Sequence, residues 1–292
     1  MSTVFVSERS IAGGGVTVTE AKSSPAPSPG VESTSGSAHA VTSALFTYGP
    51  ETRTLAVRCS ARLAPAGVVP ARQTPLVESY VATVDTAYDV VSTGDFLGTG
   101  RIVIVWRHAA TGELWGWEMN GASKTEEFYI ATADPAFRVV GTGDLDGDGG
   151  ADIVWRHETS GEVWVWLAGE PVTVEAWVGT VEDPGFEIVG VTDYTGDGKA
   201  DLLWRHAARG EVWLWAMDGA STASESYVAT VGETAYRIVG GGDYDLDGKA
   251  DILWHHDTRG EVWVWLMEGP VKRSETQVGS VPDVQYQIVK VK

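Results

Sequence analysis

A short aspartate-rich loop occurs three times in this chain. The first copy runs from Asp144 to Asp152, and the others occupy residues 193–201 and 243–251. Oxygen-bearing side chains stand at loop positions 1, 3, 5 and 9, and glycine stands at position 6. Such side chains converge with the position-7 carbonyl, as a hard cation such as Ca²⁺ requires. The loops predict about three calcium sites, whose ligands are Asp144, Asp146, Asp148, Gly150, Asp152; Asp193, Thr195, Asp197, Lys199, Asp201; Asp243, Asp245, Asp247, Lys249 and Asp251.

The sequence around the loop repeats with it. Aspartates at the first loop position, Asp95, Asp144, Asp193 and Asp243, are 49, 49 and 50 residues apart, and each is followed by a tryptophan and a later Trp-x-Trp pair. A period near 50 residues indicates an array in which no unit buries its own core alone. In the second repeat, four runs rich in β-branched and aromatic residues predict strands at 137–140, 152–157, 162–167 and 172–178. Four strands per unit is typical of a propeller blade, so we expect an all-β propeller with repeats that begin near residues 80, 129, 177 and 227.

The segment from Gly143 to Trp155 resembles the FG-GAP/VCBS repeat, which occurs in integrin α-chain propellers and in many bacterial surface proteins. The resemblance covers about residues 80–292. It implies a β-propeller with Ca²⁺ bound between the first two strands of a blade. Repeat 1 keeps Asp95 but has Leu97, Thr99 and Val103 at the other ligand positions, so we expect no metal there.

The end of the chain begins a further repeat. Residues 278–292 match a repeat start and stop before any aspartate loop. Because a propeller ring commonly completes one blade from both chain ends, we expect five blades, with a composite blade in which 278–292 closes a degenerate unit at 41–79. Residues 45–57 align with residues 153–165 and predict the second and third strands of this blade; either Val68–Val69 or the segment near Leu76–Val77 would supply the fourth. The alternative is that residues 41–79 are an unrelated cap and that another chain completes the ring.

The first 40 residues differ from the rest. They are rich in Ser, Pro and Gly, which predicts a flexible N-terminal arm before a propeller at 41–292. Within this arm, residues 3–6 and 16–19 alternate like short strands. An arm that carries a strand could dock a homo-oligomer or a larger assembly by β-addition.

Charge and composition exclude several classes of partner and site. The net charge of −19 argues against nucleic acid or an anionic membrane surface. The single cysteine, Cys59, excludes an internal disulfide, and the absence of an 18-residue apolar run argues against membrane insertion. Calcium loops suit the millimolar calcium outside cells, so we expect an extracellular or surface-associated protein, although the N-terminus shows no signal-peptide pattern.

A Trp-Arg-His run ends the second predicted strand of repeats 1 to 3 and becomes Trp-His-His in repeat 4. In the structural interpretation, the polar residues satisfy strand-end carbonyls or carboxylates and the tryptophans pack between blades. In the functional interpretation, they form a polar rim beside an aromatic wall, which resembles FG-GAP-like propeller lectins. The candidate ligand-binding residues are Arg107, His108, Arg156, His157, Arg205, His206, His255 and His256.

These patterns favour binding over catalysis. The chain contains no Gly-x-Ser-x-Gly, His-Glu-x-x-His or phosphate-loop motif, and a set repeated in every blade differs from the single asymmetric site of an enzyme. We expect a calcium-stabilised, non-catalytic propeller that recognises a glycan or a protein surface, in a lectin-like or adhesion role. The alternative is a structural subunit docked through the N-terminal arm.

Overall fold

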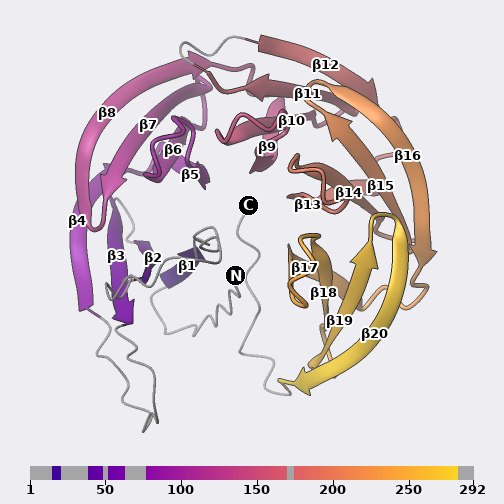
Figure 1. Ribbon diagram of the computed structural model, residues 1–292. Helices are drawn as coiled ribbons and strands as arrows, with labels where there is room; N and C mark the ends of the chain where they lie inside the picture. The colour runs from indigo at the N-terminus through magenta and orange to yellow at the C-terminus, as the bar shows by residue number, and fades with distance from the viewer. Residues whose placement is uncertain (1–14, 21–38, 49–51, 63–76, 170–173, 282–292) are drawn as a thin grey trace, which may run out of the picture. The chain divides into compact units, whose positions relative to one another are not determined.

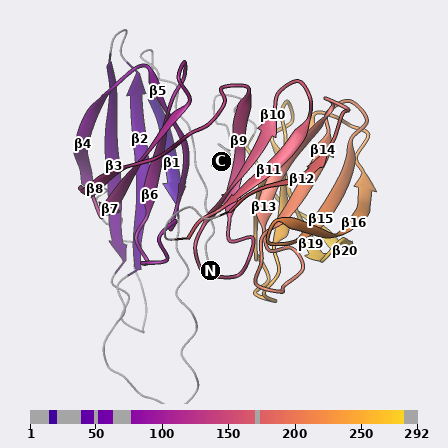
Figure 2. The same cartoon turned by 90° about the horizontal axis from the view of Figure 1, so that it is seen from above.

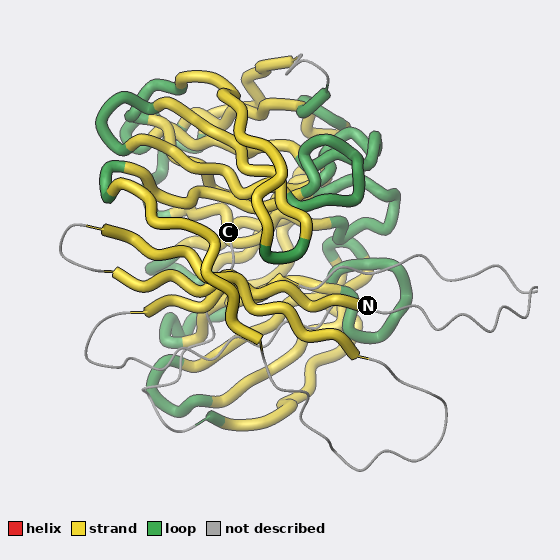
Figure 3. Tube along the Cα trace, turned by 90° about the vertical axis from the view of Figure 1, so that its left-hand side faces the viewer, coloured by secondary structure: helices red, strands yellow, loops and turns green. Residues whose placement is uncertain are grey.

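The computed structural model describes residues 15–20, 39–48, 52–62, 77–169 and 174–281 (Figure 1). Every regular element in these ranges is a β-strand, as Figure 3 shows. Across the same ranges, no helix of membrane-spanning length and hydropathy occurs. The strands form five antiparallel sheets of four strands each, which confirms the predicted all-β propeller of four-stranded blades and agrees with a blade count of five.

The chain divides into two compact units, and the first holds one sheet. Its strands stand in the order β1 (Gly15–Glu20), β2 (His39–Tyr48), β3 (Thr52–Arg62) and β4 (Val77–Asp85). The predicted hairpin is therefore confirmed as β2 and β3, and the fourth strand begins at the second of its two expected places.

The first strand of this sheet differs from our expectation. We expected the C-terminal segment beside β2, but β1 occupies that edge and pairs with residues 42–47 of β2. All four strands of this sheet therefore come from the N-terminal part of the chain. Residues 282–292 lie outside the described ranges, so their closing role stays a prediction. The domain boundary at residue 40 also stays a prediction, and β1 lies on its N-terminal side.

The second unit holds the other four sheets, each from one contiguous stretch of chain (Figure 1, Figure 2). The strands are, in order, β5 (Tyr88–Gly94), β6 (Val103–His108), β7 (Glu113–Asn120), β8 (Ser123–Thr132); β9 (Phe137–Gly143), β10 (Asp152–His157), β11 (Glu162–Leu167), β12 (Val174–Thr180); β13 (Phe186–Thr192), β14 (Asp201–His206), β15 (Glu211–Asp218), β16 (Ser221–Thr230); β17 (Tyr236–Gly242), β18 (Asp251–His256), β19 (Glu261–Glu268) and β20 (Val271–Ser280).

Successive sheets of this unit meet at their first strands. β5 lies beside β9, β9 beside β13, and β13 beside β17. Small residues permit this approach: a Cβ atom added to Gly141 on β9 would lie 2.4 Å from Cγ2 of Val191 on β13. Each first strand also carries a β-bulge against the second strand, for example between Ile188 and Gly190. The glycines near the ends of these strands therefore belong to the sheet.

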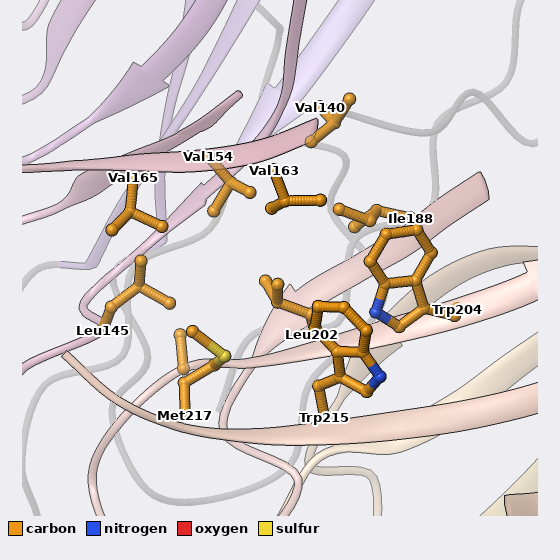
Figure 4. Close-up of a cluster of buried hydrophobic side chains, with 11 residues drawn as sticks. Val140, Leu145, Val154, Val163, Val165, Ile188, Leu202, Trp204, Trp215 and Met217 are labelled. Atoms are coloured by element: carbon orange, nitrogen blue, oxygen red, sulfur yellow. The ribbon is translucent and has the colours of Figure 1, made fainter. Parts of the chain in front are cut away.

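Apolar side chains fill the space between neighbouring sheets. Figure 4 shows one such cluster, in which Val154, Val163 and Val165 of the β9–β12 sheet face Leu202 and Met217 of the next sheet. All five side chains are at most 1% exposed. Because strand side chains alternate between two faces, the β9–β12 and β13–β16 sheets each bury one face against the preceding sheet of this unit and the other against the next.

The tryptophans mark the same interfaces. The tryptophan of each second strand is buried and packs against the second tryptophan of the Trp-x-Trp pair: Trp155 lies 4.7 Å from Trp166, ring centroid to ring centroid, and Trp204 lies 4.8 Å from Trp215. These contacts agree with the structural interpretation, in which the tryptophans pack between blades.

Candidate metal centres and neighbouring motifs

The three aspartate loops connect the first and second strands of their sheets and share one conformation. In the second repeat, the two oxygens of Asp144 accept hydrogen bonds from the backbone N–H groups of Gly147, at 2.7 Å, and Gly149, at 2.9 Å. Asp193 and Asp243 accept the equivalent pairs of bonds. The first aspartate therefore folds the loop around its own carboxylate, and the next ligand positions follow from that turn.

The aspartate at position 9 ties the loop to the end of the third strand. Asp152 is fully buried, and its oxygens accept hydrogen bonds at 2.7 Å from the backbone N–H groups of Leu145 and Ala168. Burial first, and then the neighbouring carboxylates of Asp146 and Asp144, outweigh the effect of these hydrogen bonds and together raise the pKa of Asp152 to about 7. A bound cation would offset this cost of ionisation, because it supplies the missing positive charge.

Two of the loops gather three carboxylates closely enough to hold one ion. Oxygen atoms of Asp144, Asp146 and Asp152 all lie within 4.8 Å of one another, and a second such group contains Asp243, Asp245 and Asp247. An all-oxygen donor set fits Ca²⁺. These residues would hold the ion, and the ion would supply positive charge to an acidic loop whose position-9 aspartate is buried. Among the described residues, loop 3 forms no such group of acids, since Thr195 replaces one aspartate.

Repeat 1 keeps the shape of the loop with a different donor set. The oxygens of Asp95 accept hydrogen bonds from Thr99 N–H, at 3.0 Å, and Gly100 N–H, at 2.6 Å. The backbone N–H of Met119, which corresponds to the Ala168 group bound by Asp152, donates to the carbonyl of Ile102 at 2.8 Å. Position 9 is Val103, which has no side-chain acceptor. The Ile102 carbonyl therefore accepts the hydrogen bond that corresponds to the one Asp152 accepts from Ala168.

Consecutive loops are joined by their backbones. The N–H of the alanine at loop position 8 donates to the carbonyl of the first aspartate in the preceding loop: Ala200 to Asp144 at 2.6 Å, and Ala250 to Asp193 at 2.7 Å. Ala151 makes the same bond to the Asp95 carbonyl of repeat 1. The first aspartate therefore shapes its own loop with its side chain and holds the next sheet with its carbonyl.

Comparison with known families agrees with this geometry. Residues 193–254, which run from loop 3 through loop 4 to Trp254 on β18, match the FG-GAP-like repeat. No curated protein matches the chain.

Solved structures resemble the chain only at low identity. A chain from the crystal structure of a nidogen/laminin complex has a TM-score of 0.49 at 10% identity, over 85% of this chain and 78% of that one. The Dos1 propeller has a TM-score of 0.41 at 10% identity, over 82% and 56%. Prolyl oligopeptidase B from Galerina marginata has a TM-score of 0.43 at 12% identity, over 81% of this chain and 33% of that one. These likenesses carry no information about activity or partners.

The fourth repeat differs from the second and third at its loop. Leu246 occupies position 4, where loops 2 and 3 have glycine, and its φ of 69° is the only positive φ of a non-glycine residue in the described ranges. The guanidinium of Arg273 lies 2.8 Å from Asp247 and 3.6 Å from Asp245. Two expected metal ligands therefore already face a positive charge from the same chain.

The arginines of the Trp-Arg-His run join each sheet to the next. Arg156 donates hydrogen bonds to the carbonyls of Phe186 and Val181, and its guanidinium lies 5.2 Å from the ring centroid of Trp204 in the following sheet. Burial lowers the pKa of Arg156 from its usual value. Arg107 and Arg205 make corresponding contacts one repeat earlier and one repeat later.

The histidines hold the turn between the second and third strands. In each repeat Nδ1 accepts hydrogen bonds from the backbone N–H groups two and three residues later; for His256 the distances are 3.3 and 3.1 Å. In the last two repeats Nε2 also faces a carboxylate: His206 lies 3.3 Å from Asp183, and His256 lies 3.0 Å from Glu233. His255 stands where the other repeats have arginine, and its buried Nε2 has no hydrogen-bond partner within the described ranges.

These contacts are those expected from the structural interpretation of the run, and ligand binding by its residues stays a prediction.

The sequence analysis missed another group. Tyr129, Trp177 and Tyr227 lie on the outer strands β8, β12 and β16, and each is more than half exposed. Their recurrence at the start of each repeat was visible in the sequence, but only the structure shows that these aromatics face solvent.

Proposed function

We propose that this chain is a calcium-stabilised, non-catalytic propeller that recognises a glycan or a surface partner outside the cell. The observation that carries the calcium part is the geometry of loops 2 and 4, each of which brings three carboxylates within 4.8 Å. The same loops join successive sheets through the position-8 alanines. A cation bound there would stabilise both the loop and the junction between sheets.

Repetition supports binding over catalysis. The backbone bond between loops and the histidine turn recur in successive repeats, and the arginine contact recurs in the first three, so the same features are presented several times. Equivalent surfaces suit a ligand that itself repeats, because several weak contacts then act together. An enzyme requires one asymmetric set of groups instead.

Thermal unfolding with and without calcium tests the first part of the proposal. Each site at a hundredfold excess of free ion over Kd should add about 2.7 kcal/mol to the free energy of unfolding. EDTA should therefore lower the melting temperature, and Mg²⁺ should restore it poorly because it resists crowded protein sites. An identical melting curve in EDTA and in calcium would contradict the proposal.

Binding assays test the second part. A glycan array probed in calcium separates glycan recognition from a purely structural role, and native mass measurement detects an assembly. Array binding by a monomer would support recognition. A stable oligomer without array binding would favour the structural subunit instead.

A further inference from the structure

One aromatic position on the outer strand stays exposed in three successive sheets. Tyr129, Trp177 and Tyr227 are 52%, 55% and 52% exposed. Each lies three residues before a threonine that is itself exposed. Single exposed aromatics are common on protein surfaces. Here the same exposure recurs at equivalent places, which indicates a repeated surface feature.

Each exposed ring stands beside a partly buried tryptophan of the neighbouring strand. Tyr129 contacts Trp115 edge to face, with ring centroids 5.6 Å apart, and Tyr227 contacts Trp213 at 5.5 Å. Trp177 pairs in register with Trp164. The inner tryptophan supports one side of the exposed ring and leaves the other side open to solvent.

Hydroxyl groups fix the outer edge of the tyrosine rings. The hydroxyl of Tyr129 lies 2.8 Å from that of Thr132, and the hydroxyl of Tyr227 lies 2.8 Å from that of Thr230. A ring held at both ends loses little conformational entropy when a ligand covers its free face. The two tyrosine rings are therefore held in place before any ligand arrives.

Polar groups surround the aromatic pair. Glu211 pairs across the strands with Thr230, and its carboxylate accepts a hydrogen bond from Trp213 Nε1 at 3.4 Å. Glu162 and Thr180 pair in the same way beside Trp164. An aromatic face with hydroxyls and a carboxylate near its edge matches a pyranose ring, which offers an apolar C–H face and a rim of hydroxyls.

The residues around each exposed aromatic favour a sugar over a protein surface as its ligand. Each of these three sheets offers a single exposed aromatic at this position, flanked on its strand by exposed polar residues such as Glu127 and Glu225. A stable protein interface needs a continuous patch of about 800 Å² on each partner. A sugar ring needs only one aromatic face. The flanking glutamates and the net charge of −19 oppose anionic sugars and leave neutral ones.

We propose that Tyr129, Trp177 and Tyr227 are the centres of three equivalent binding sites for pyranose residues of a neutral polysaccharide. This inference rests on the proposed function as a binding propeller and names its ligand class and its residues. The last sheet supplies an internal comparison, because Gln277 occupies the equivalent place near Trp263. Gln277 can form hydrogen bonds, but it lacks the aromatic face that Tyr129, Trp177 and Tyr227 present.

The test is a printed array of neutral and acidic glycans in calcium, followed by calorimetric titration with the strongest neutral oligosaccharide and its monosaccharide. The wild type should bind the oligosaccharide about 10²-fold more tightly than the monosaccharide. The triple variant Tyr129→Ala/Trp177→Ala/Tyr227→Ala should lose that advantage. Val271→Ala, at an exposed position of β20, should bind as the wild type does.

A gain of binding protects the test against a variant that merely unfolds. Gln277→Tyr removes nothing from the three sites and should strengthen binding of the oligosaccharide. If the wild type binds and the folded triple variant binds equally well, these sites are refuted while the proposed function survives. If the wild type binds no glycan, the sites and the glycan part of the proposed function both fail, and calcium-dependent melting still tests the remainder. A preference for anionic glycans would refute the neutral ligand.

Discussion

The loop of the fourth repeat should be stabilised by replacing Leu246 with glycine. Leu246 has a φ of 69°, whereas Gly147 and Gly196 at the same loop position have a φ of 82°. A side chain in this left-handed region costs about 1–2 kcal/mol. Glycine loses that strain but gives the unfolded chain more freedom, at a cost of about 0.5–1 kcal/mol. We therefore expect Leu246→Gly to raise the free energy of unfolding by about 0.5–1 kcal/mol.

Little else should change at this position. The Leu246 side chain is 60% exposed, and its backbone N–H, which donates to Asp243 at 2.6 Å, stays in place in the glycine variant. For a domain of roughly 200 residues, the expected gain corresponds to a rise in melting temperature of about 1–4 °C. Differential scanning calorimetry in EDTA measures this without any contribution from metal.

Two control variants separate backbone strain from other effects. Leu246→Ala keeps the left-handed backbone and removes most of the exposed side chain, so it should change stability by less than about 0.5 kcal/mol. Gly147→Ala imposes strain on loop 2, where the added Cβ would meet only Lys199 at an ordinary 3.6 Å, and should lower stability by about 0.5–1 kcal/mol. Equal or lower stability of Leu246→Gly, or a stabilising Gly147→Ala, would refute the strain argument.

Three further changes probe the buried contacts. Arg156→Ala should cost about 2–4 kcal/mol in urea unfolding, because it leaves buried carbonyls of the next sheet unpaired, whereas exposed Arg138→Ala should stay within about 0.5 kcal/mol. Asp152→Ala should cost about 2–4 kcal/mol, since two backbone N–H groups lose their acceptor, and should also reduce the calcium-dependent rise in melting temperature. The pKa of Glu233 is lowered from 4.5 to about 2 by hydrogen bonds from an arginine and a histidine, so its contribution to stability is present above pH 4.5 and disappears as the pH falls towards 2. Glu233→Gln should flatten this part of the stability–pH curve, and an unchanged curve would show that the pair contributes nothing.

Local patterns predicted the second repeat well. The strands expected at 152–157 and 162–167 are β10 and β11, because polar turns delimit both runs. The first strand was expected to end at Val140 and continues to Gly143. Glycines usually suggest a break, but here Gly141 leaves room for Val191 of the next sheet. The end of β9 depends on a contact between sheets, which the local sequence alone does not predict.

Contacts between segments that lie far apart in the sequence were the least predictable from the sequence. Two segments had the strand-like alternation needed to pair with the edge of β2, one near Val16 and one at the C-terminus. The segment near Val16 forms β1 and pairs with β2. The Trp-Arg-His run posed a similar problem, because its composition suits both a binding rim and a buried contact. Only the burial of Arg156 and its hydrogen bonds to Phe186 and Val181 show which contacts it makes. The aspartate loops were easier to predict, since their acids are close in sequence, and loops 2 and 4 each bring three of the expected acids together.

Repeat 1 indicates how much of the fold depends on metal. Its loop lacks the full carboxylate set, yet Asp95 still shapes the turn and Met119 N–H still finds a carbonyl acceptor. Sheet pairing and loop shape therefore form without four acidic side chains, and a bound ion would add stability to a loop that is already folded. We expect EDTA to lower the melting temperature while the far-ultraviolet circular dichroism spectrum at 20 °C keeps its β-sheet form. Loss of that spectrum on chelation would show instead that the ions are required for the sheets to form, and that repeat 1 is held in place by its metal-loaded neighbours.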